Sequence, residues 1–213
     1  MVLLNSKSNC VAILLGFFVI IVGTCADMGH RAYAAGQPNH QSALSFVESS
    51  YKTLAQRSPS GSPSKKTLDT IKPMFDFTTF CSKTIQDFAT HLNPTDQASF
   101  CQAFSQLFFM TLAEKGLRFG NERLASVTYT LKQLENNTAQ VTMSGTHETH
   151  SYHIAFELIP NPSHAWKITD IDVSGALLSR NYRSVFNRIF REEGISGLMS
   201  RMQAKQTELV AKR

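Results

Sequence analysis

Two aspartates in the C-terminal third are the residues best placed for acid–base chemistry. Asp170 and Asp172 are two positions apart in a segment that alternates apolar and polar residues, so both project from one face of a strand. Paired carboxylates can act as general acid and base in a hydrolase or isomerase. No His or Tyr pattern in the sequence completes such a site. A strand-end pair that solvates the sheet edge, or that caps the turn before Gly175, explains the two residues better.

Three histidines suggest a metal site, which their spacing does not support. His147, His150 and His153 surround Glu148, but Ser151 stands where the zinc-protease pattern His-Glu-x-x-His requires its second histidine. A hairpin centred on His150 would bring His147 opposite His153. Two imidazoles without an acidic third ligand make a poor zinc site. We therefore expect no metal and no cofactor.

A basic cluster follows the aspartates along the chain. It comprises Arg180, Arg183, Arg188 and Arg191, in a stretch with helical spacing. Such a cluster is either a solvated helix face or a contact for a lipid headgroup or a partner protein, because arginine forks match phosphate geometry. The sequence lacks a Gly-x-Ser-x-Gly nucleophile motif and a phosphate-binding glycine loop. We expect a protein without enzymatic activity.

The N-terminus indicates export. Lys7 is followed by an uncharged apolar run, 11–23, shorter than the roughly 20 residues that span a bilayer. This pattern predicts a signal peptide over residues 1–34 and a mature protein in the periplasm. Cleavage after Ala26, acylation of Cys25 and an uncleaved anchor stay open. The formal net charge of +5 suits anionic lipid or acidic protein surfaces, and no motif indicates nucleic-acid binding.

Two cysteines remain after removal of residues 1–34. Cys81 and Cys101 lie on two apolar helical stripes and are roughly equidistant from the turn near Asn93-Pro94. An antiparallel helix pair could place them opposite each other in an oxidising compartment. The sequence is compatible with a structural disulfide and with two buried free thiols.

The periodicity of the chain changes from helical to alternating after Gly120. We expect helices at 42–57, around 65–72, at 77–92 and from Pro94 to about Gly116, the last capped by Asn93. We expect strands near 127–132, 141–144, 152–158 and 166–172. This order predicts an α+β fold in which helices cover one face of a four-stranded antiparallel sheet. Residues 35–205 would form one domain, followed by a polar, frayed tail at 206–213.

The last expected helical segment follows Gly175. Its apolar positions are Tyr182, Val185, Phe186, Ile189 and Phe190. We interpret the segment from Gly194 to Gly197 as a break between two C-terminal helices.

Two motifs in this framework resemble those of a known family. The run Trp166-Lys-Ile-Thr-Asp-Ile-Asp-Val-Ser-Gly-Ala-Leu-Leu-Ser-Arg-Asn-Tyr-Arg183 and the triplet Phe75-Asp76-Phe77 resemble the toluene-tolerance family of MlaC-type periplasmic phospholipid-binding proteins. The resemblance covers most of the mature chain. It is weaker at 91–93, where family members often have Leu-Gly and an aromatic residue, and the Ser/Pro/Gly-rich loop at 58–64 resembles an insertion.

The resemblance implies a function as well as a fold. It implies a monomeric phospholipid carrier with a curved sheet and helices around an apolar pocket. Such a carrier would shuttle lipid between an outer-membrane lipoprotein complex and an inner-membrane ATP-driven transporter, maintaining outer-membrane asymmetry. Three alternatives stay open: an isomerase or hydrolase on a cone-shaped sheet that uses Asp170 or Asp172, an envelope scaffold anchored through Cys25, and a carrier of a sterol-like lipid.

A carrier requires an apolar lining, and the fifteen phenylalanines can either line a pocket or fill a core. The residues expected to line the pocket lie on alternating strand positions and on helical stripes: Phe80, Phe104, Phe108, Tyr129, Val141, Met143, Ile154, Phe156, Ile168 and Leu177. Tyr182 and Arg183 match the Tyr-Arg of the family, and we expect them to contact a headgroup or a partner protein.

Overall fold

A computed structural model describes residues 40–57, 65–112, 125–147, 150–162 and 165–211. The chain divides into two units, Met1–Ala35 and Gly36–Arg213, and every described residue belongs to the second unit. The expected signal peptide lies outside the described residues, as does the loop at 58–64. None of the helices in the described segments combines the length and apolar character that a bilayer-crossing helix requires.

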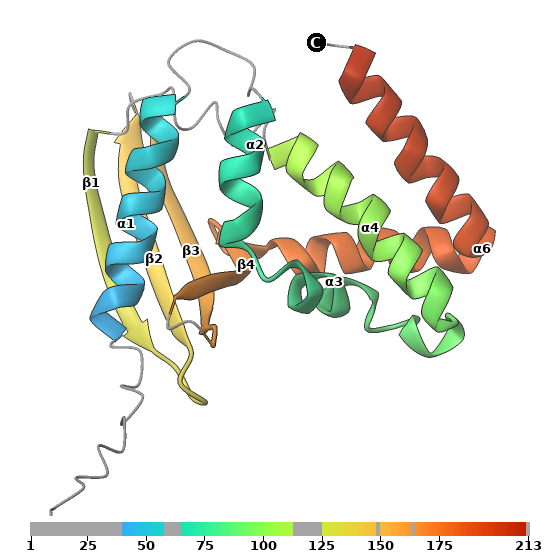
Figure 1. Cartoon of the computed structure of the whole chain (residues 1–213), viewed down its shortest axis with the longest axis horizontal. Coiled ribbons are helices and arrows are strands. Elements are labelled where there is room, and N and C mark those ends of the chain that lie inside the picture. The colour runs from blue at the N-terminus through green and yellow to red at the C-terminus, as the bar shows by residue number, and fades with distance from the viewer. Residues whose placement is uncertain (1–39, 58–64, 113–124, 148–149, 163–164, 212–213) are drawn as a thin grey trace, which may run out of the picture. The chain divides into compact units, whose positions relative to one another are not determined.

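The second unit is an α+β fold, as the sequence predicts (Figure 1). Its helical elements are α1 (His40–Arg57), α2 (Lys65–Ile71), the 3-10 turn η1 (Lys72–Met74), α3 (Phe77–Ile85), the 3-10 turn η2 (Ala89–His91), α4 (Pro94–Thr111) and α6 (Leu178–Ala211). Its strands are β1 (Ala125–Gln133), β2 (Ala139–His147), β3 (His150–Pro160), β4 (Trp166–Val173) and β5 (Ala176–Leu177).

The strands form one antiparallel sheet in chain order, β1-β2-β3-β4-β5. The four expected strands are present, and the two-residue strand β5 is an addition that the sequence analysis missed. The alternating sequence pattern of β5 is too short to identify a strand. Ser174 and Gly175, both at positive φ, reverse the chain immediately after β4. Asn136 and Asn137, also at positive φ, make the equivalent turn between β1 and β2, a conformation that Asn tolerates better than most residues.

A β-bulge in β4 determines which side chains share a face of the sheet. Glu157 pairs with Asp170, whereas the next residue of β3, Leu158, pairs with Ile168, so Thr169 is the extra residue. Cross-strand partners lie on the same face of a sheet. The bulge therefore puts Ile168 on the face of Leu158 and moves Asp170 to the opposite face, beside Glu157.

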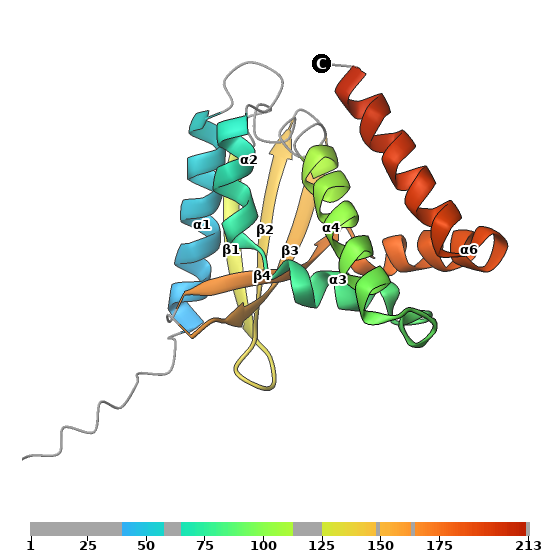
Figure 2. The same cartoon turned by 45° about the vertical axis from the view of Figure 1, so that its right-hand side comes forward.

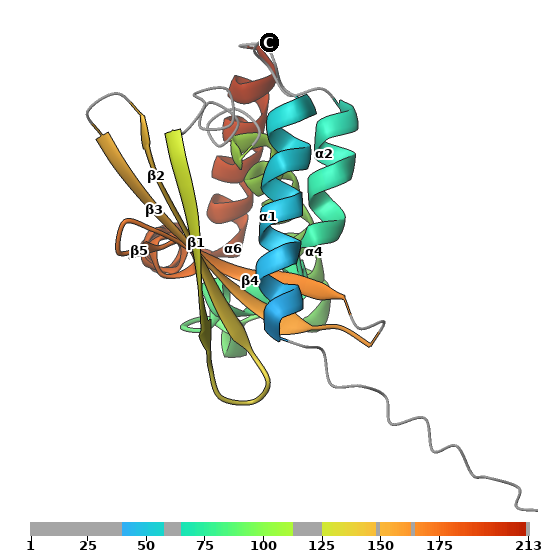
Figure 3. The same ribbon diagram turned by 90° about the vertical axis from the view of Figure 1, so that its left-hand side faces the viewer.

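Helix α1 covers one face of the sheet (Figure 3). Ala43 and Val47 of α1 are buried, and the Trp166 indole N–H donates to the Ser42 hydroxyl at 2.7 Å. This bond joins the start of β4 to the start of α1. The expected apolar face of α1 is thus confirmed at Val47, which is 3 % exposed.

Helices α3, α4 and α6 gather on the β4 side of the sheet, where their aromatic rings pack together (Figure 1). We call the following residues the aromatic cluster: Phe77, Phe80, Phe100, Phe104, Phe108, Tyr182 and Phe186. A disulfide between Cys81 and Cys101, with a Cα–Cα distance of 5.8 Å, joins α3 to α4. The structure thereby decides between the disulfide and the two free thiols.

Helix α3 is shorter than the sequence predicts. The expected helix from 77 to 92 ends at Ile85, and a 3-10 turn, Ala89–His91, follows. The backbone leaves the helix because Phe88 takes φ −132° and ψ 5°, which stacks its ring on Phe190 at 4.5 Å. The next helix starts as expected, because the Asn93 side chain accepts the Asp96 N–H at 2.8 Å ahead of Pro94.

Helix α6 is broken at Gly194, as the sequence predicts, where φ is 67° and ψ is −171° (Figure 2). Arg201 forms an ion pair with Glu193 across the break. The prediction of a frayed tail is wrong, because α6 continues through this segment and ends at Ala211. The part of α6 that follows Gly194 packs against α4. Leu209 is 5 % exposed, and the Gln206 side-chain amide donates to the Ala103 carbonyl at 2.8 Å.

Candidate functional site

The helix-covered side of the sheet carries six of the ten expected lining residues. We call these six the inner sheet face: Tyr129, Val141, Met143, Ile154, Phe156 and Ile168. The register aligns them in rows across the strands, with Tyr129 beside Met143, Met143 beside Ile154, and Val141 beside Phe156. The sheet thus brings together residues that are up to 39 positions apart, between 129 and 168.

The members of the inner sheet face differ in how completely they are packed. Val141 is 0 % exposed and Met143 is 4 % exposed. Tyr129, Ile154 and Phe156 are only half-buried, although they are direct cross-strand neighbours of these two residues. Apolar side chains that keep accessible surface on a helix-covered face are not fully used as protein core.

Helix α1 influences the polar atom of this face, the Tyr129 hydroxyl. Burial, together with the nearby Tyr51 and Glu48 of α1, raises the pKa of Tyr129 from 10.0 to about 12. The phenol therefore stays neutral far above physiological pH. A neutral hydroxyl next to apolar neighbours gives the face a hydrogen-bonding group without a charge.

The three expected lining residues on helices lie in the aromatic cluster. Phe80 and Phe104 are 0 % exposed, and Phe108 is 2 % exposed. Phe80 stacks on Phe104 at 5.8 Å between ring centroids and lies 4.8 Å from Phe108. In this conformation the three rings fill protein core, and they would line a pocket only after the helices separate. Their assignment as lining stays a prediction.

Leu177, the tenth expected residue, is half-buried in β5 and pairs with Asp172. It lies in the strand that leads directly into α6.

Tyr182 and Arg183 occupy different environments. The Tyr182 ring packs edge-on against Phe104 at 4.9 Å, and burial raises the pKa of Tyr182. The Arg183 guanidinium donates to the Gln86 side chain at 2.9 Å and lies 4.0 Å from Asp87. A headgroup or partner contact for these two residues stays a prediction.

The two aspartates that suggested acid–base chemistry make structural hydrogen bonds. Asp172 accepts the Gly175 N–H at 2.6 Å and so caps the turn before β5, one of the two structural roles that the sequence favours. Asp170 is 0 % exposed, and its Oδ1 accepts the N–H groups of Ile171 and Ser179 at 2.9 and 3.1 Å. Ser179 is in the first turn of α6, so Asp170 caps that helix from the neighbouring strand.

A lysine that the sequence analysis missed completes this junction. Lys83 of α3 donates to Glu157 at 2.9 Å and lies 3.5 Å from Asp170 Oδ2. Asp170 Oδ2 is buried and accepts no hydrogen bond in the structure. The ion pair with Lys83 therefore provides its nearest charge compensation. Asp170 reaches the face of the sheet that carries Glu157 only because of the bulge in β4, which the sequence periodicity does not show.

The histidines lie in a hairpin, but its centre differs from the expected one. His147 pairs with His150, and Ser144 pairs with His153, so the hairpin is not centred on His150 and His147 does not face His153. His153 Nδ1 lies 3.0 Å from the Ser144 hydroxyl. Within the described part of the chain, no three His, Cys, Asp or Glu side chains gather as a metal site would require.

The triplet Phe75-Asp76-Phe77 links the sheet to the aromatic cluster. Phe75 bridges to Ile168 of β4 and packs edge-on against Phe109 at 5.3 Å. Asp76 caps α3 by accepting the Thr79 N–H at 3.0 Å, and Phe77 lies 5.3 Å from Phe104. Each residue of this motif thus has a structural role.

Comparison with known proteins agrees with these motifs. The family model described as MlaC protein matches residues 49–204. The chain belongs to the MlaC family. The match covers most of the second unit, from within α1 to within the second half of α6.

One solved structure shares this fold. It is a phospholipid-binding protein from Ralstonia solanacearum in complex with a phospholipid. The two chains are 19 % identical, with a TM-score of 0.65 over 80 % of this chain and 98 % of the other. At this identity the likeness concerns the fold. No curated protein matched the chain in the sequence comparison.

Proposed function

We propose that this MlaC-family protein is a periplasmic phospholipid carrier that holds acyl chains against its inner sheet face. The observation that supports this best is the incomplete packing of that face, where Tyr129, Ile154 and Phe156 are half-buried beside fully buried neighbours. Family membership and the phospholipid bound by the Ralstonia protein support the same ligand class.

The free energy of lipid transfer sets what the lining must do. Each methylene moved into water costs about 0.8 kcal/mol, so a lipid with about 30 methylenes costs on the order of 24 kcal/mol. A carrier must therefore offer an apolar environment along most of both chains. Hydrophobic burial of this kind is non-directional, which suits exchange with a bilayer because no bond has to form or break.

We assign different parts of the lining to the two apolar regions. The inner sheet face would contact the chains first, since part of it is accessible without rearrangement. Phe80, Phe104, Phe108 and Leu177 would form the facing wall in a lipid-bound state in which α3, α4 and α6 have moved. Tyr182 and Arg183 would contact the headgroup or a partner protein in that state.

Two glycines are our candidates for the hinges of this movement. Gly175 is at φ 88° in the turn that leads into α6, and Gly194 is at φ 67° in the break within α6. Both conformations strongly favour glycine, and a Cβ at either position would meet no neighbour within 4 Å. A substitution there would act through the backbone and not through a steric clash.

The wider transport role follows from the family resemblance. We propose that the carrier exchanges lipid with an outer-membrane lipoprotein complex and an inner-membrane ATP-driven transporter, and so contributes to outer-membrane asymmetry. Both partners would have to open the same apolar region, because the carrier itself has no energy source in this scheme.

Native mass spectrometry of the protein purified from its own cell envelope, with lipid extraction of the bound fraction, tests the proposed function. We expect one phospholipid adduct on the cleaved mass. Delipidated protein should also take up phospholipid from vesicles. A protein that is empty as purified and stays empty after incubation with vesicles would refute the carrier function.

A further inference from the structure

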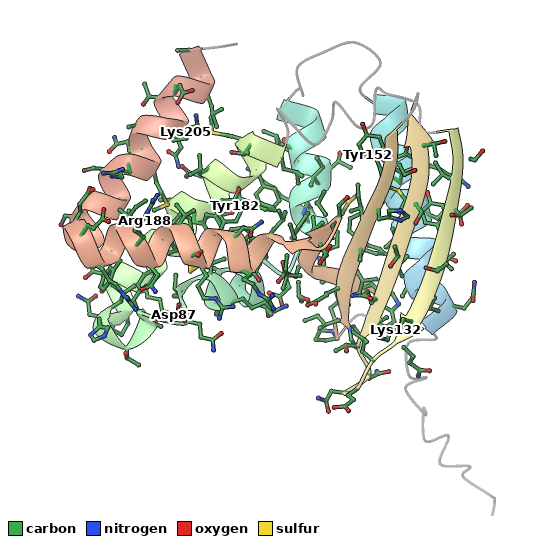
Figure 4. The ribbon with its side chains drawn as sticks, turned by 180° about the vertical axis from the view of Figure 1, so that it is seen from behind. Asp87, Lys132, Tyr152, Tyr182, Arg188 and Lys205 are labelled. Carbon is green, nitrogen blue, oxygen red and sulfur yellow. A yellow bond between two sulfur atoms is a disulfide. The ribbon has the colours of Figure 1, made fainter. Side chains whose placement is uncertain are left out.

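The outer side of the first half of α6 carries a row of arginines. Arg180, Ser184, Arg188 and Arg191 are all exposed. Their spacing of three or four residues keeps them on one side of the helix, within an arc of roughly 80° and along roughly 16 Å. We call Arg180, Arg188 and Arg191 the arginine row. Figure 4 shows this part of α6 in front of α3 and α4, with Arg188 labelled.

The arginine row has no acidic partner within the described segments. Arg183 of the same helix donates a hydrogen bond to Gln86 and lies near Asp87. In contrast, none of the ion pairs among the described residues involves Arg180, Arg188 or Arg191. Two acidic residues end this half: Glu193 is paired with Arg201, and the exposed Glu192 follows Arg188 by one turn without forming an ion pair with the row. The row therefore presents three positive charges without an ion-pair partner to solvent, beside the exposed carboxylate of Glu192.

Helix stability does not account for all of these charges. Arg188 and Arg191 lie within the last two turns before the break at Gly194, where the helix dipole favours cations, but Arg180 does not. The N-terminus of a helix carries a partial positive charge, so cations are favourable at the C-terminus. Arg180 is in the first turn of α6, and this turn contains no acidic residue. The Asp170 carboxylate at this terminus offsets part of the dipole, and the remaining dipole does not favour Arg180, so Arg180 is available for a role outside the fold.

The surroundings of the row favour a lipid surface over a protein partner. A specific protein interface needs an apolar centre and about 800 Å² on each partner. The exposed large apolar residues in the described chain are Val185, 44 % exposed, and the distant Val210. A convex helix side with arginines and one valine lacks such a centre. A polybasic segment, in contrast, binds anionic headgroups through charge alone.

We propose that the arginine row docks the protein on anionic lipid bilayers, with the first half of α6 lying along the headgroups. The identity of the surface rests on the proposed function, since a phospholipid carrier must meet lipid. Docking itself requires no lipid uptake, so the two proposals can fail separately.

Binding to vesicles tests the docking surface. The probe is phosphatidylcholine vesicles containing a minority of phosphatidylglycerol, with pure phosphatidylcholine vesicles for comparison, and the readout is the fraction of protein that sediments with them. Each arginine near an anionic surface contributes about fivefold to binding. The variant Arg180→Gln/Arg188→Gln/Arg191→Gln should therefore bind about 100-fold more weakly.

A matched variant controls for net charge. Lys72→Gln/Lys132→Gln/Lys205→Gln removes three exposed positive charges elsewhere and should weaken binding by less than about fivefold in total. Binding of the wild type should also fall between about 0.01 M and about 0.1 M salt, as the Debye length shrinks from about 30 Å to about 10 Å. Circular dichroism should show all variants folded.

Equal losses in the two triple variants, or equal wild-type binding to both kinds of vesicle, would overturn the docking surface. The proposed docking surface would also be overturned if the wild-type protein does not bind vesicles but binds an acidic protein through the arginine row. Loss of vesicle binding in the arginine variant, with a bound phospholipid retained from the cell, would leave both proposals standing. Docking by a protein that never carries lipid would refute only the carrier function.

Discussion

The protein has two apolar regions that differ in how completely they are filled. In the aromatic cluster, Phe80 and Phe104 are 0 % exposed and their rings are 5.8 Å apart. On the inner sheet face, Ile154 and Phe156 keep accessible surface beside the buried Val141 and Met143. Both regions belong to one contiguous core, in which Phe75 and Ile168 connect them.

We propose that this difference separates a region that stabilises the protein from one that a lipid can occupy. Close-packed rings gain dispersion contacts and lose them if anything is removed. A face that is not fully packed gives up some of that stability and gains room for apolar guests. We therefore expect mutations in the aromatic cluster to affect the free energy of unfolding, and mutations on the inner sheet face to affect lipid binding.

Truncation within the aromatic cluster should have the largest effect. Phe104→Ala removes a ring that touches Phe80, Phe100, Tyr182 and Phe186. We expect a loss of about 3–5 kcal/mol in the free energy of unfolding, measured by urea denaturation. A loss below about 1 kcal/mol would show that the cluster is not close-packed and would remove the contrast between the regions.

Removal of the disulfide should come next. It closes a loop with a sequence separation of 20 residues, and Cys81→Ala/Cys101→Ala should cost about 3 kcal/mol by restoring the entropy of the unfolded chain. Thermal unfolding with and without a reductant measures this. The double variant should show no further response to reductant, and phospholipid loading of the folded variant should stay unchanged.

Two tryptophan substitutions on one strand should separate packing from lipid binding. Leu158→Trp, at a residue that is 1 % exposed, should cost about 1–3 kcal/mol by overpacking. Ile154→Trp, on the same face of β3 but half-buried, should cost less than about 1 kcal/mol and should lower phospholipid uptake. Denaturation and vesicle-uptake assays on both variants measure this, and unchanged uptake in Ile154→Trp would contradict the lipid position.

The two tyrosines with a raised pKa report on the two regions at alkaline pH. The folded-state pKa of Tyr129, about 12, lies above the unfolded value of 10.0. Its contribution to stability is therefore complete below about pH 10 and is lost as the pH rises towards about 12. Tyr129→Phe should lose less stability over this window than the wild type, in urea midpoints measured at each pH.

Lipid loading should raise the pKa of Tyr129, because a lipid against the inner sheet face would bury Tyr129 further, as seen in the ultraviolet titration of tyrosinate. The pKa of Tyr182, raised by burial in the aromatic cluster, should change only through the proposed movement of α3, α4 and α6. A shift of Tyr182 without a shift of Tyr129 would place the lipid among the helices.

Local patterns predicted most of the elements, and long-range contacts decided the rest. Asn93 and Pro94 fixed the start of α4 because a cap acts within one turn. The end of α3 at Ile85 depended on Phe88 stacking on Phe190, which is about a hundred residues away in sequence. The short strand β5 has too few residues to give a periodic signal.

The candidate site was predictable as a set of alternating residues but not as a packed surface. Periodicity placed Val141 and Phe156 on one face, and the register confirms that they are neighbours. Sequence alone could not tell which of them is buried, because α1 covers the face unevenly. It also missed Lys83, whose partners Glu157 and Asp170 come together only through the bulge in β4.

Photo-crosslinking tests most directly whether lipid lies on the inner sheet face. A benzophenone amino acid is placed at Phe156 or, as a matched control, at Phe190, a half-buried phenylalanine among the helices. After irradiation of the lipid-loaded protein, intact mass should show a phospholipid adduct at Phe156 and none at Phe190. An adduct at Phe190 with none at Phe156 would contradict the account, because the aromatic region and not the sheet would then hold the lipid.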